Sequence, residues 1–141
     1  MTEFVLDNSV AMRWFLESDK PVDQKYAEQV LVSMSDASAI VPNLWHLEAC
    51  NVLLGAEKRS DVEPGEVERF ISQLESLPIR VDAITAHQVF SRTMALSRIY
   101  KLSSYDAAYL ELAVREGLPI ATLDKDLRKA AKKTEVEIYL K

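Results

Sequence analysis

The hydrophobic positions of the chain follow two periods that alternate along the sequence. We expect buried strands from the short apolar runs at 4–6, 39–41, 79–81 and 119–122. Between them, apolar residues recur every three or four positions, which predicts helices that pack through one face. We expect these helices at 10–16, 22–34, 44–58, 62–74, 85–100, 103–117 and 125–133. The alternation of Val136, Ile138 and Leu140 predicts a last, fifth strand.

Short strands that alternate with helices indicate an α/β domain with a mostly parallel sheet and helices on both faces. Parallel strands need long crossover connections, and the predicted helices supply them. The length of 141 residues suits a single domain, which we expect over 1–141. The helix at 44–58 is apolar on most sides, so we expect it, and Cys50 within it, to be largely buried.

The helix at 103–117 places one charged residue where an apolar one is expected. Its apolar residues share one face, and we expect Glu111 and Arg115 to lie together on the opposite, solvated face. Asp106 falls nearly opposite these two residues, so its carboxylate is expected to point inward. An inward charge is costly unless something compensates it.

Three further carboxylates join Asp106 by their placement. Asp7 ends the first strand, Asp124 follows the strand at 119–122, and Glu48 lies in the apolar helix. Ligand sites of open parallel sheets lie at the carboxyl ends of the strands. Clustered carboxylates raise one another's pKa, and hard cations such as Mg²⁺ or Mn²⁺ remove that cost and suit phosphoryl chemistry.

Each of these carboxylates also has a purely structural interpretation. Asp7 and Asp124 can cap the helices that follow them, and Asp106 can be favoured by the dipole of its own helix. Glu48 can pair with Arg59. None of these interpretations explains why all four carboxylates point inward or follow strand ends, and we therefore predict a metal site.

Composition excludes several other kinds of functional site. The net charge of −5 and the pI of about 5.1 argue against a broad basic face for nucleic acid, unless bound metal reverses the local sign. One cysteine and two distant histidines make a zinc site improbable, and no glycine-rich phosphate loop occurs. The single cysteine fits a reducing cytoplasm. We find neither a signal peptide nor an apolar run long enough to span a membrane.

Four motifs occur in a fixed order over nearly the whole chain. They are Asp7-x-Ser9 after the first strand, Pro42-x-Leu44-Trp45-x-x-Glu48-x-x-Asn51-x-Leu53, Tyr105-Asp106-Ala107-Ala108-Tyr109 and Thr122-x-Asp124. Together they resemble the PIN-domain ribonucleases, and most closely the VapC-type toxins of prokaryotic type II toxin–antitoxin pairs. The resemblance implies a three-layer α/β/α domain with a five-stranded sheet ordered 3-2-1-4-5, a homodimer, and a small antitoxin that blocks the site.

The resemblance also implies roles for individual residues. The catalytic and metal-binding carboxylates would be Asp7, Glu48, Asp106 and Asp124, with Mg²⁺ or Mn²⁺ as the cofactor and RNA as the substrate. Supporting polar groups would come from Ser9, Asn51 and Thr122.

Basic residues near these motifs are candidates for contact with RNA. Lys125, Arg128, Lys129, Lys132 and Lys133 are candidates for an RNA-facing patch beside Asp124, and Arg13 is a candidate for contact with phosphate or with the antitoxin. A solvated surface is the alternative for each of them.

Two other functions stay open at this stage. One is a phosphatase with Asp7 as nucleophile, but such enzymes carry a second aspartate two residues later, where this sequence has Ser9. A catalytically silent protein-binding module would keep the fold alone.

Overall fold

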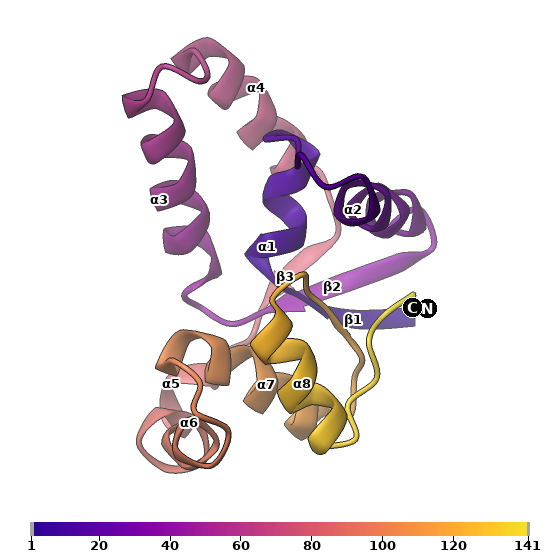
Figure 1. Cartoon of the computed structure of the whole chain (residues 1–141), viewed down its shortest axis with the longest axis vertical. Helices are drawn as coiled ribbons and strands as arrows, with labels where there is room; N and C mark the ends of the chain where they lie inside the picture. Colours follow the sequence, from indigo (N-terminus) through magenta and orange to yellow (C-terminus); the bar gives the residue numbers. More distant parts are fainter. Residues whose placement is uncertain (1, 141) are drawn as a thin grey trace.

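Four parallel strands form the middle layer of the molecule in the computed structural model, which describes residues 2–140 (Figure 1). The sheet order is β3-β2-β1-β4, so β1 is central. Val5 on β1 pairs with Ile40 on one side and with Ile120 on the other. The strands are β1 (Thr2–Leu6), β2 (Ala37–Val41), β3 (Ile79–Val81) and β4 (Ile120–Ala121).

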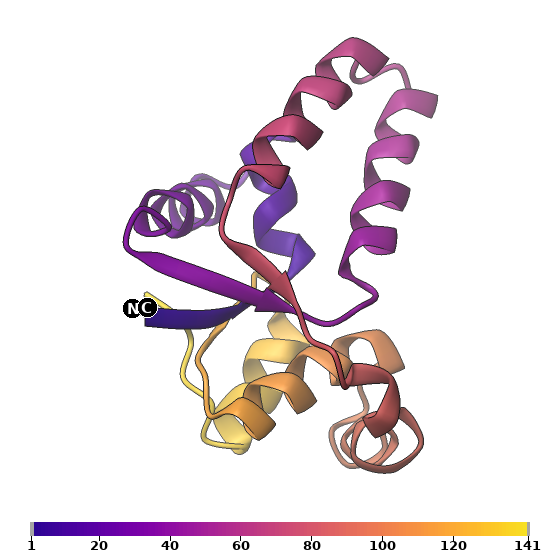
Figure 2. The same cartoon turned by 180° about the vertical axis from the view of Figure 1, so that it is seen from behind.

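Helices cover both faces of this sheet, as the two opposite views agree (Figures 1 and 2). The first face carries α1 (Asn8–Ala11), the short 3-10 helix η1 (Met12–Trp14), α2 (Pro21–Ser33), α3 (Trp45–Lys58) and α4 (Pro64–Glu75). The other face carries α5 (Thr85–Gln88), the π-helical turn η2 (Val89–Thr93), α6 (Met94–Tyr100), α7 (Ser104–Glu116) and α8 (Lys125–Lys133). The three-layer α/β/α architecture is therefore confirmed. In residues 2–140 no helix combines the length and the apolar character needed to cross a bilayer.

The predicted fifth strand is reduced to one bridge, between Ile138 and Ile120. The chain turns away because Leu140 adopts a left-handed backbone conformation, with φ of 57°. Tyr139 is buried instead, and its ring stacks on Phe4 with centroids 4.0 Å apart. The sheet therefore has four strands rather than five, in the expected order 3-2-1-4.

Three helical predictions also need correction, the first for the helix at 85–100. It contains the π-helical turn η2, which rotates the following positions relative to a regular helix. Phe90, which lies within this turn, is 87% exposed.

The helix at 44–58 is less buried than its composition predicts. Only the stripe of Trp45, Ala49, Leu53 and Ala56 is buried along α3. Leu47 is 76% exposed, and Cys50 is exposed as well.

The prediction that Glu111 and Arg115 lie on a solvated face of α7 is wrong. Glu111 is buried, and Arg115 binds it with 2.8 Å between Nε and Oε2. A second carboxylate, Asp82, lies 2.7 Å from Arg115 Nη2 and accepts a hydrogen bond from Thr85. The segment between β3 and α5 brings Asp82 to this side of α7, and α5 packs on the helix, so it is covered where the sequence pattern suggested water.

Candidate active site

The four predicted carboxylates are carried by four elements that end or begin at the carboxyl edge of the sheet. Asp7 follows β1, and Asp124 follows the adjacent β4 and caps α8 by accepting a hydrogen bond from Leu127 N at 2.8 Å. Asp106 lies in the first turn of α7, which Ser103 caps. Glu48 lies in the first turn of α3. Asp7 and Asp124 become neighbours because β1 and β4 are paired in parallel.

Asp7 is the most deeply buried of the four, with 6% of its surface exposed. Its Oδ2 atom accepts hydrogen bonds from the hydroxyls of Ser9 at 2.6 Å and Thr122 at 2.7 Å. Burial raises the pKa of Asp7 to about 6, the two hydroxyls lower it only in part, and the charges of Glu48 and Asp124 raise it further. The predicted supporting residues Ser9 and Thr122 thus orient this carboxylate without neutralising it.

Glu48 is held by two residues that sequence reasoning missed. The hydroxyl of Tyr109 donates to Glu48 Oε1 at 2.5 Å, and Asn8 Nδ2 lies 3.3 Å from the same atom. Asn8 Nδ2 also donates to the Trp45 carbonyl at 2.9 Å. Tyr109 belongs to the motif at 105–109 but lies on an apolar helical stripe, and Asn8 occupies the open position between Asp7 and Ser9, so the sequence pattern assigns a polar role to neither. Together they fix Glu48 relative to β1 and α7.

Asp106 is partly buried, and its carboxylate accepts no hydrogen bond from any described residue. Burial raises its pKa to about 6, and the negative charges of Asp124, Asp7, Glu48 and Asp126 add to the shift. The carboxylate of Asp106 is therefore close enough to Asp7, Glu48 and Asp124 for their charges to raise its pKa, as expected from the sequence. The structure brings the four carboxylates into one electrostatic field, and no cation among residues 2–140 forms an ion pair with them.

The remaining predicted residues divide into two groups. Asn51 is exposed on α3 and makes no side-chain hydrogen bond within the described chain. It therefore does not bind any of the four carboxylates. Arg128 turns inward, where its Nε donates to the Thr122 carbonyl at 2.7 Å and its guanidinium lies 5.0 Å from the Tyr26 ring centroid. Through this hydrogen bond Arg128 fixes the loop between β4 and α8. Lys125 and Lys129 are exposed on α8, and Arg13 is partly exposed on η1.

The donor set fits a hard divalent cation. Carboxylate and hydroxyl oxygens are the ligands that Mg²⁺ and Mn²⁺ prefer. Within residues 2–140, no three Asp, Glu, His or Cys side chains are close enough together to hold one ion directly. Mg²⁺ nevertheless keeps several waters and is commonly bound through only one or two carboxylates. Asp7 and Asp106, whose pKa values are both raised to about 6 and which form no ion pair in residues 2–140, are the candidate ligands of such an ion.

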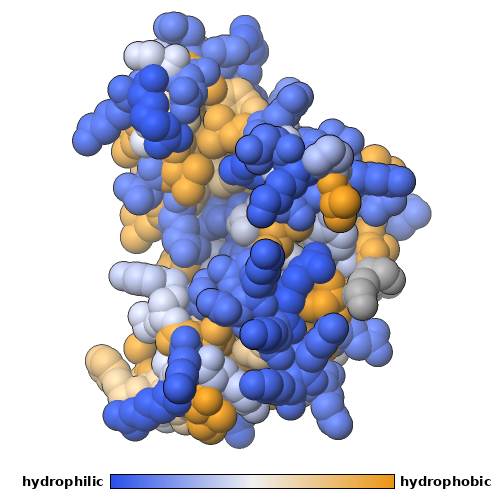
Figure 3. Space-filling view, in the orientation of Figure 1, coloured by the Kyte–Doolittle hydropathy of each residue, from blue (hydrophilic) through white to orange (hydrophobic). Residues whose placement is uncertain are grey.

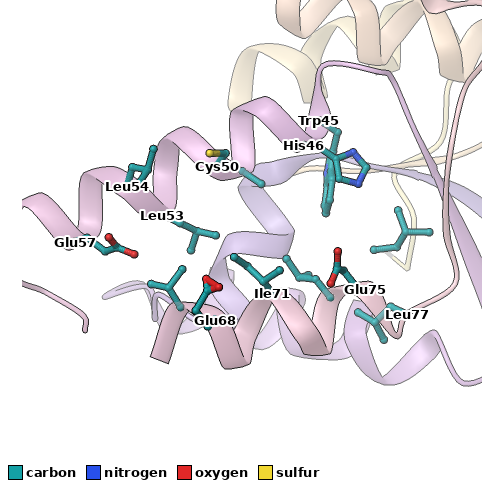
Figure 4. A pocket seen from close by; sticks show the side chains of 14 residues that line it. Trp45, His46, Cys50, Leu53, Leu54, Glu57, Glu68, Ile71, Glu75 and Leu77 are labelled. Atoms are coloured by element: carbon teal, nitrogen blue, oxygen red, sulfur yellow. The ribbon is translucent and has the colours of Figure 1, made fainter. Parts of the chain in front are cut away.

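A separate apolar groove of about 600 Å³ lies between α3 and α4 (Figure 4). It is lined by apolar side chains such as Leu53 and Ile71, and none of the four carboxylates lines it. The indole Nε1 of Trp45 is buried there without a hydrogen-bond partner in the described chain. Acidic side chains also line the groove, namely Glu57, Glu68 and Glu75.

Comparison with known proteins agrees with this architecture. The crystal structure of PAE2754 from Pyrobaculum aerophilum is similar, with a TM-score of 0.65 over 92% of this chain and 79% of that one. The two sequences are 18% identical, so this likeness shows the fold alone. No curated protein matches the sequence. The family model of the PIN domain matches residues 4–133, and the chain therefore belongs to the PIN-domain family.

Proposed function

We propose that this protein is a Mg²⁺- or Mn²⁺-dependent endoribonuclease that acts as the toxin of a type II toxin–antitoxin pair. PIN domains generally form a metal-dependent nuclease fold, which is the family context of the proposal. The observation that carries it is the shared field of Asp7, Glu48, Asp106 and Asp124. Two of these carboxylates have pKa values raised to about 6, and no protein cation pairs with any of the four in residues 2–140.

In this proposal each residue of the site has a definite task. One or two of the carboxylates of Asp7, Glu48, Asp106 and Asp124 would bind the ion directly and the others through its waters. When bound, the ion would supply a water of lowered pKa and a positive charge beside the phosphate oxygens. Ser9 and Thr122 fix the direction of the Asp7 carboxylate through their hydroxyls. No side-chain nucleophile is needed, which separates this reaction from that of an aspartate-nucleophile phosphatase.

The proposed antitoxin has a suitable docking surface in the groove between α3 and α4. Its apolar lining favours an apolar segment, and the acidic residues Glu57, Glu68 and Glu75 favour basic residues beside it. The proposed homodimer is supported by the exposed apolar residues Leu47 and Phe90, which do not line this groove.

The function is tested by RNA cleavage with the purified protein. Wild type should cleave single-stranded RNA with millimolar Mg²⁺ or Mn²⁺ and stop in EDTA. Asp106→Asn should lose at least about a hundredfold in rate, because the amide keeps the shape but not the charge. Asp36→Asn, which changes an exposed carboxylate, serves as the matched control and should cleave at the wild-type rate.

The same variants separate the alternative functions. Expression of wild type without its partner should arrest growth, and Asp106→Asn should relieve the arrest. A folded wild type that cleaves no RNA with either metal would indicate a silent binding module. Hydrolysis of a phosphomonoester in place of RNA would indicate the phosphatase. Full cleavage by folded Asp106→Asn would overturn the site assignment.

A further inference from the structure

A small cavity of about 270 Å³ between the end of α6 and the exposed face of α8 gathers three lysines. Lys129 and Lys133 lie one helical turn apart on α8, and Lys101 comes from the turn between α6 and α7. Tyr100 and Asp126 complete the polar lining. The face of the molecule that carries α8 in Figure 1 is mostly hydrophilic in Figure 3.

The three ammonium groups are not neutralised by the protein. Within residues 2–140 every ion pair is made by an arginine, so none involves Lys101, Lys129 or Lys133. Asp126 is the one carboxylate that lines the cavity among the described residues, which leaves an excess of positive charge there. In a chain with a net charge of −5, such a local excess is a distinct feature.

The three lysines meet opposing local effects. Lys101 adopts a left-handed conformation, with φ of 56°, at the end of α6, where glycine is the favoured residue. Lys129 and Lys133 are like charges four residues apart on one helix, a spacing that destabilises the helix slightly. Lys101 and Lys133 also lie at the C-terminal ends of their helices, where the helix dipole favours a cation. Local structure therefore neither requires nor excludes a further role for these charges.

The cavity adjoins the carboxylate site on two sides. Lys101 lies two residues before Ser103, which caps the helix that carries Asp106. Asp126, which lines the cavity, lies in the first turn of α8, two residues after Asp124, which caps that helix. A strand bound at the carboxylates can therefore continue over the end of α7 into the cavity.

We infer that Lys101, Lys129 and Lys133 form a subsite for an internucleotide phosphate of the RNA strand, to one side of the scissile bond. The inference rests on the proposed nuclease function and adds a specific binding site to it. Lysine is a point-charge donor suited to phosphate oxygens, and the ring of Tyr100 offers a surface against which the adjoining sugar or base can pack. Arg128, one of the RNA contacts expected from the sequence, is not part of this subsite because it binds the Thr122 carbonyl.

The test measures binding of a single-stranded RNA oligonucleotide to the full-length protein in EDTA, by fluorescence anisotropy. The double variant Lys129→Gln/Lys133→Gln should bind about tenfold more weakly than wild type. Its dependence of log K on log salt should be shallower by about 0.7, as expected for one lost phosphate contact on a single strand. The control Lys25→Gln/Lys58→Gln removes the same charge from exposed positions on α2 and α3, and should bind within about twofold of wild type.

Lys101→Gly provides a second variant that cannot fail by unfolding. Glycine suits the left-handed position, so its melting temperature should be no lower than that of wild type. Its affinity for RNA should nevertheless fall. Equal affinity for wild type, Lys101→Gly and the double variant would overturn the subsite, as would an equal loss in the control.

Two further results distinguish this subsite from a free-anion site and from a failure of the nuclease function itself. Inorganic phosphate should compete with RNA only weakly, and competition at the affinity of RNA itself would show a free-anion site instead. Metal-dependent cleavage by wild type together with unchanged cleavage and affinity in both subsite variants, Lys101→Gly and Lys129→Gln/Lys133→Gln, would reject the subsite alone. Absence of any cleavage by wild type would reject the nuclease function first.

Discussion

Asp7 and Asp82 occupy equivalent places in the fold, yet their surroundings differ. Each directly follows a parallel strand, and each has 6% of its surface exposed. Burial would raise the pKa of Asp82, but hydrogen bonds from Arg115 and Thr85 and the charge of Arg115 hold it below its ordinary value. Asp7 meets only the hydroxyls of Ser9 and Thr122, and burial raises its pKa to about 6.

The difference shows that an acidic residue at a strand end does not by itself mark a functional site. The Asp82 cluster contains its own cation, since Arg115 binds both Asp82 and Glu111. The Asp7 cluster has no such cation among residues 2–140. α7 contributes to both, with Arg115 near its C-terminal end and Asp106 in its first turn. One end of this helix therefore fastens it to β3, and the other presents a charge that needs an ion from outside.

The largest effect is expected from breaking the Asp82 cluster with Arg115→Met. Methionine keeps an apolar stem but leaves Asp82 and Glu111 buried without a counter-charge, which costs about 3–5 kcal/mol of unfolding free energy. Arg59→Met is the matched control, because the pair of Arg59 with Asp61 is exposed, and its cost should stay below about 1 kcal/mol. Urea unfolding at pH 7 measures both. A similar small loss in the two variants would show that the Arg115 network does not anchor α7.

Sequence reasoning predicted the fold well because its signals are local. Strand positions, crossover helices and the order 3-2-1-4 follow from apolar periodicity and the family motifs. The prediction of a fifth strand was wrong because Leu140 adopts a left-handed conformation that ends the extended chain. Hydrophobic alternation carries no information about that backbone angle. The π-helical turn at Val89–Thr93 likewise changes which side faces inward without altering composition.

The candidate site was predicted less evenly. Motifs placed Asp7 and Asp124 at neighbouring strand ends, where the structure has them. Asn8 and Tyr109 were missed because their role depends on contacts across 40 and 61 residues of chain, to Glu48. Glu111 and Arg115 were misplaced for the converse reason. A charged pair on a helix is normally solvated, and only the arrival of Asp82 from β3 makes its burial favourable.

A smaller effect should distinguish the two clusters by their response to metal. An ion that binds only the folded protein stabilises it by about 2.7 kcal/mol at a hundredfold excess over Kd. Asp124→Asn should respond less, because it removes one carboxylate while the asparagine can still cap α8 at Leu127. Asp61→Asn, whose carboxylate pairs with the exposed Arg59, should respond as wild type does.

The measurement is thermal unfolding of the three proteins at pH 7, first in EDTA and then with millimolar Mg²⁺ or Mn²⁺. Asp124→Asn should also melt higher than wild type in EDTA, because it relieves like-charge repulsion. A wild type with no metal-dependent shift, together with a lower melting point of Asp124→Asn in EDTA, would contradict the clustered-carboxylate interpretation.

The smallest effect concerns pH, where the two clusters should act with opposite signs. The pKa of Asp106 rises from its ordinary value of 3.8 to about 6 on folding, so the folded protein holds this proton more tightly than the unfolded chain. The resulting stability is fully present below about pH 4 and is lost as pH rises through about 6. Asp82 has a lowered pKa, so its contribution is present above about pH 4 and is lost as pH falls.

Asp106→Asn isolates the first of these two contributions. In EDTA the variant should be more stable than wild type at pH 7, and the difference should shrink towards zero at about pH 4, where the wild-type carboxylate is protonated. Because Asp106 is only partly buried and solvent screens its charge, the gain at pH 7 should not exceed about 1 kcal/mol. Asp36→Asn, at an exposed position, should show no such trend. Urea unfolding of the three proteins between pH 4 and pH 7 gives the comparison, and a variant less stable than wild type at pH 7 would show that Asp106 is compensated by the protein itself.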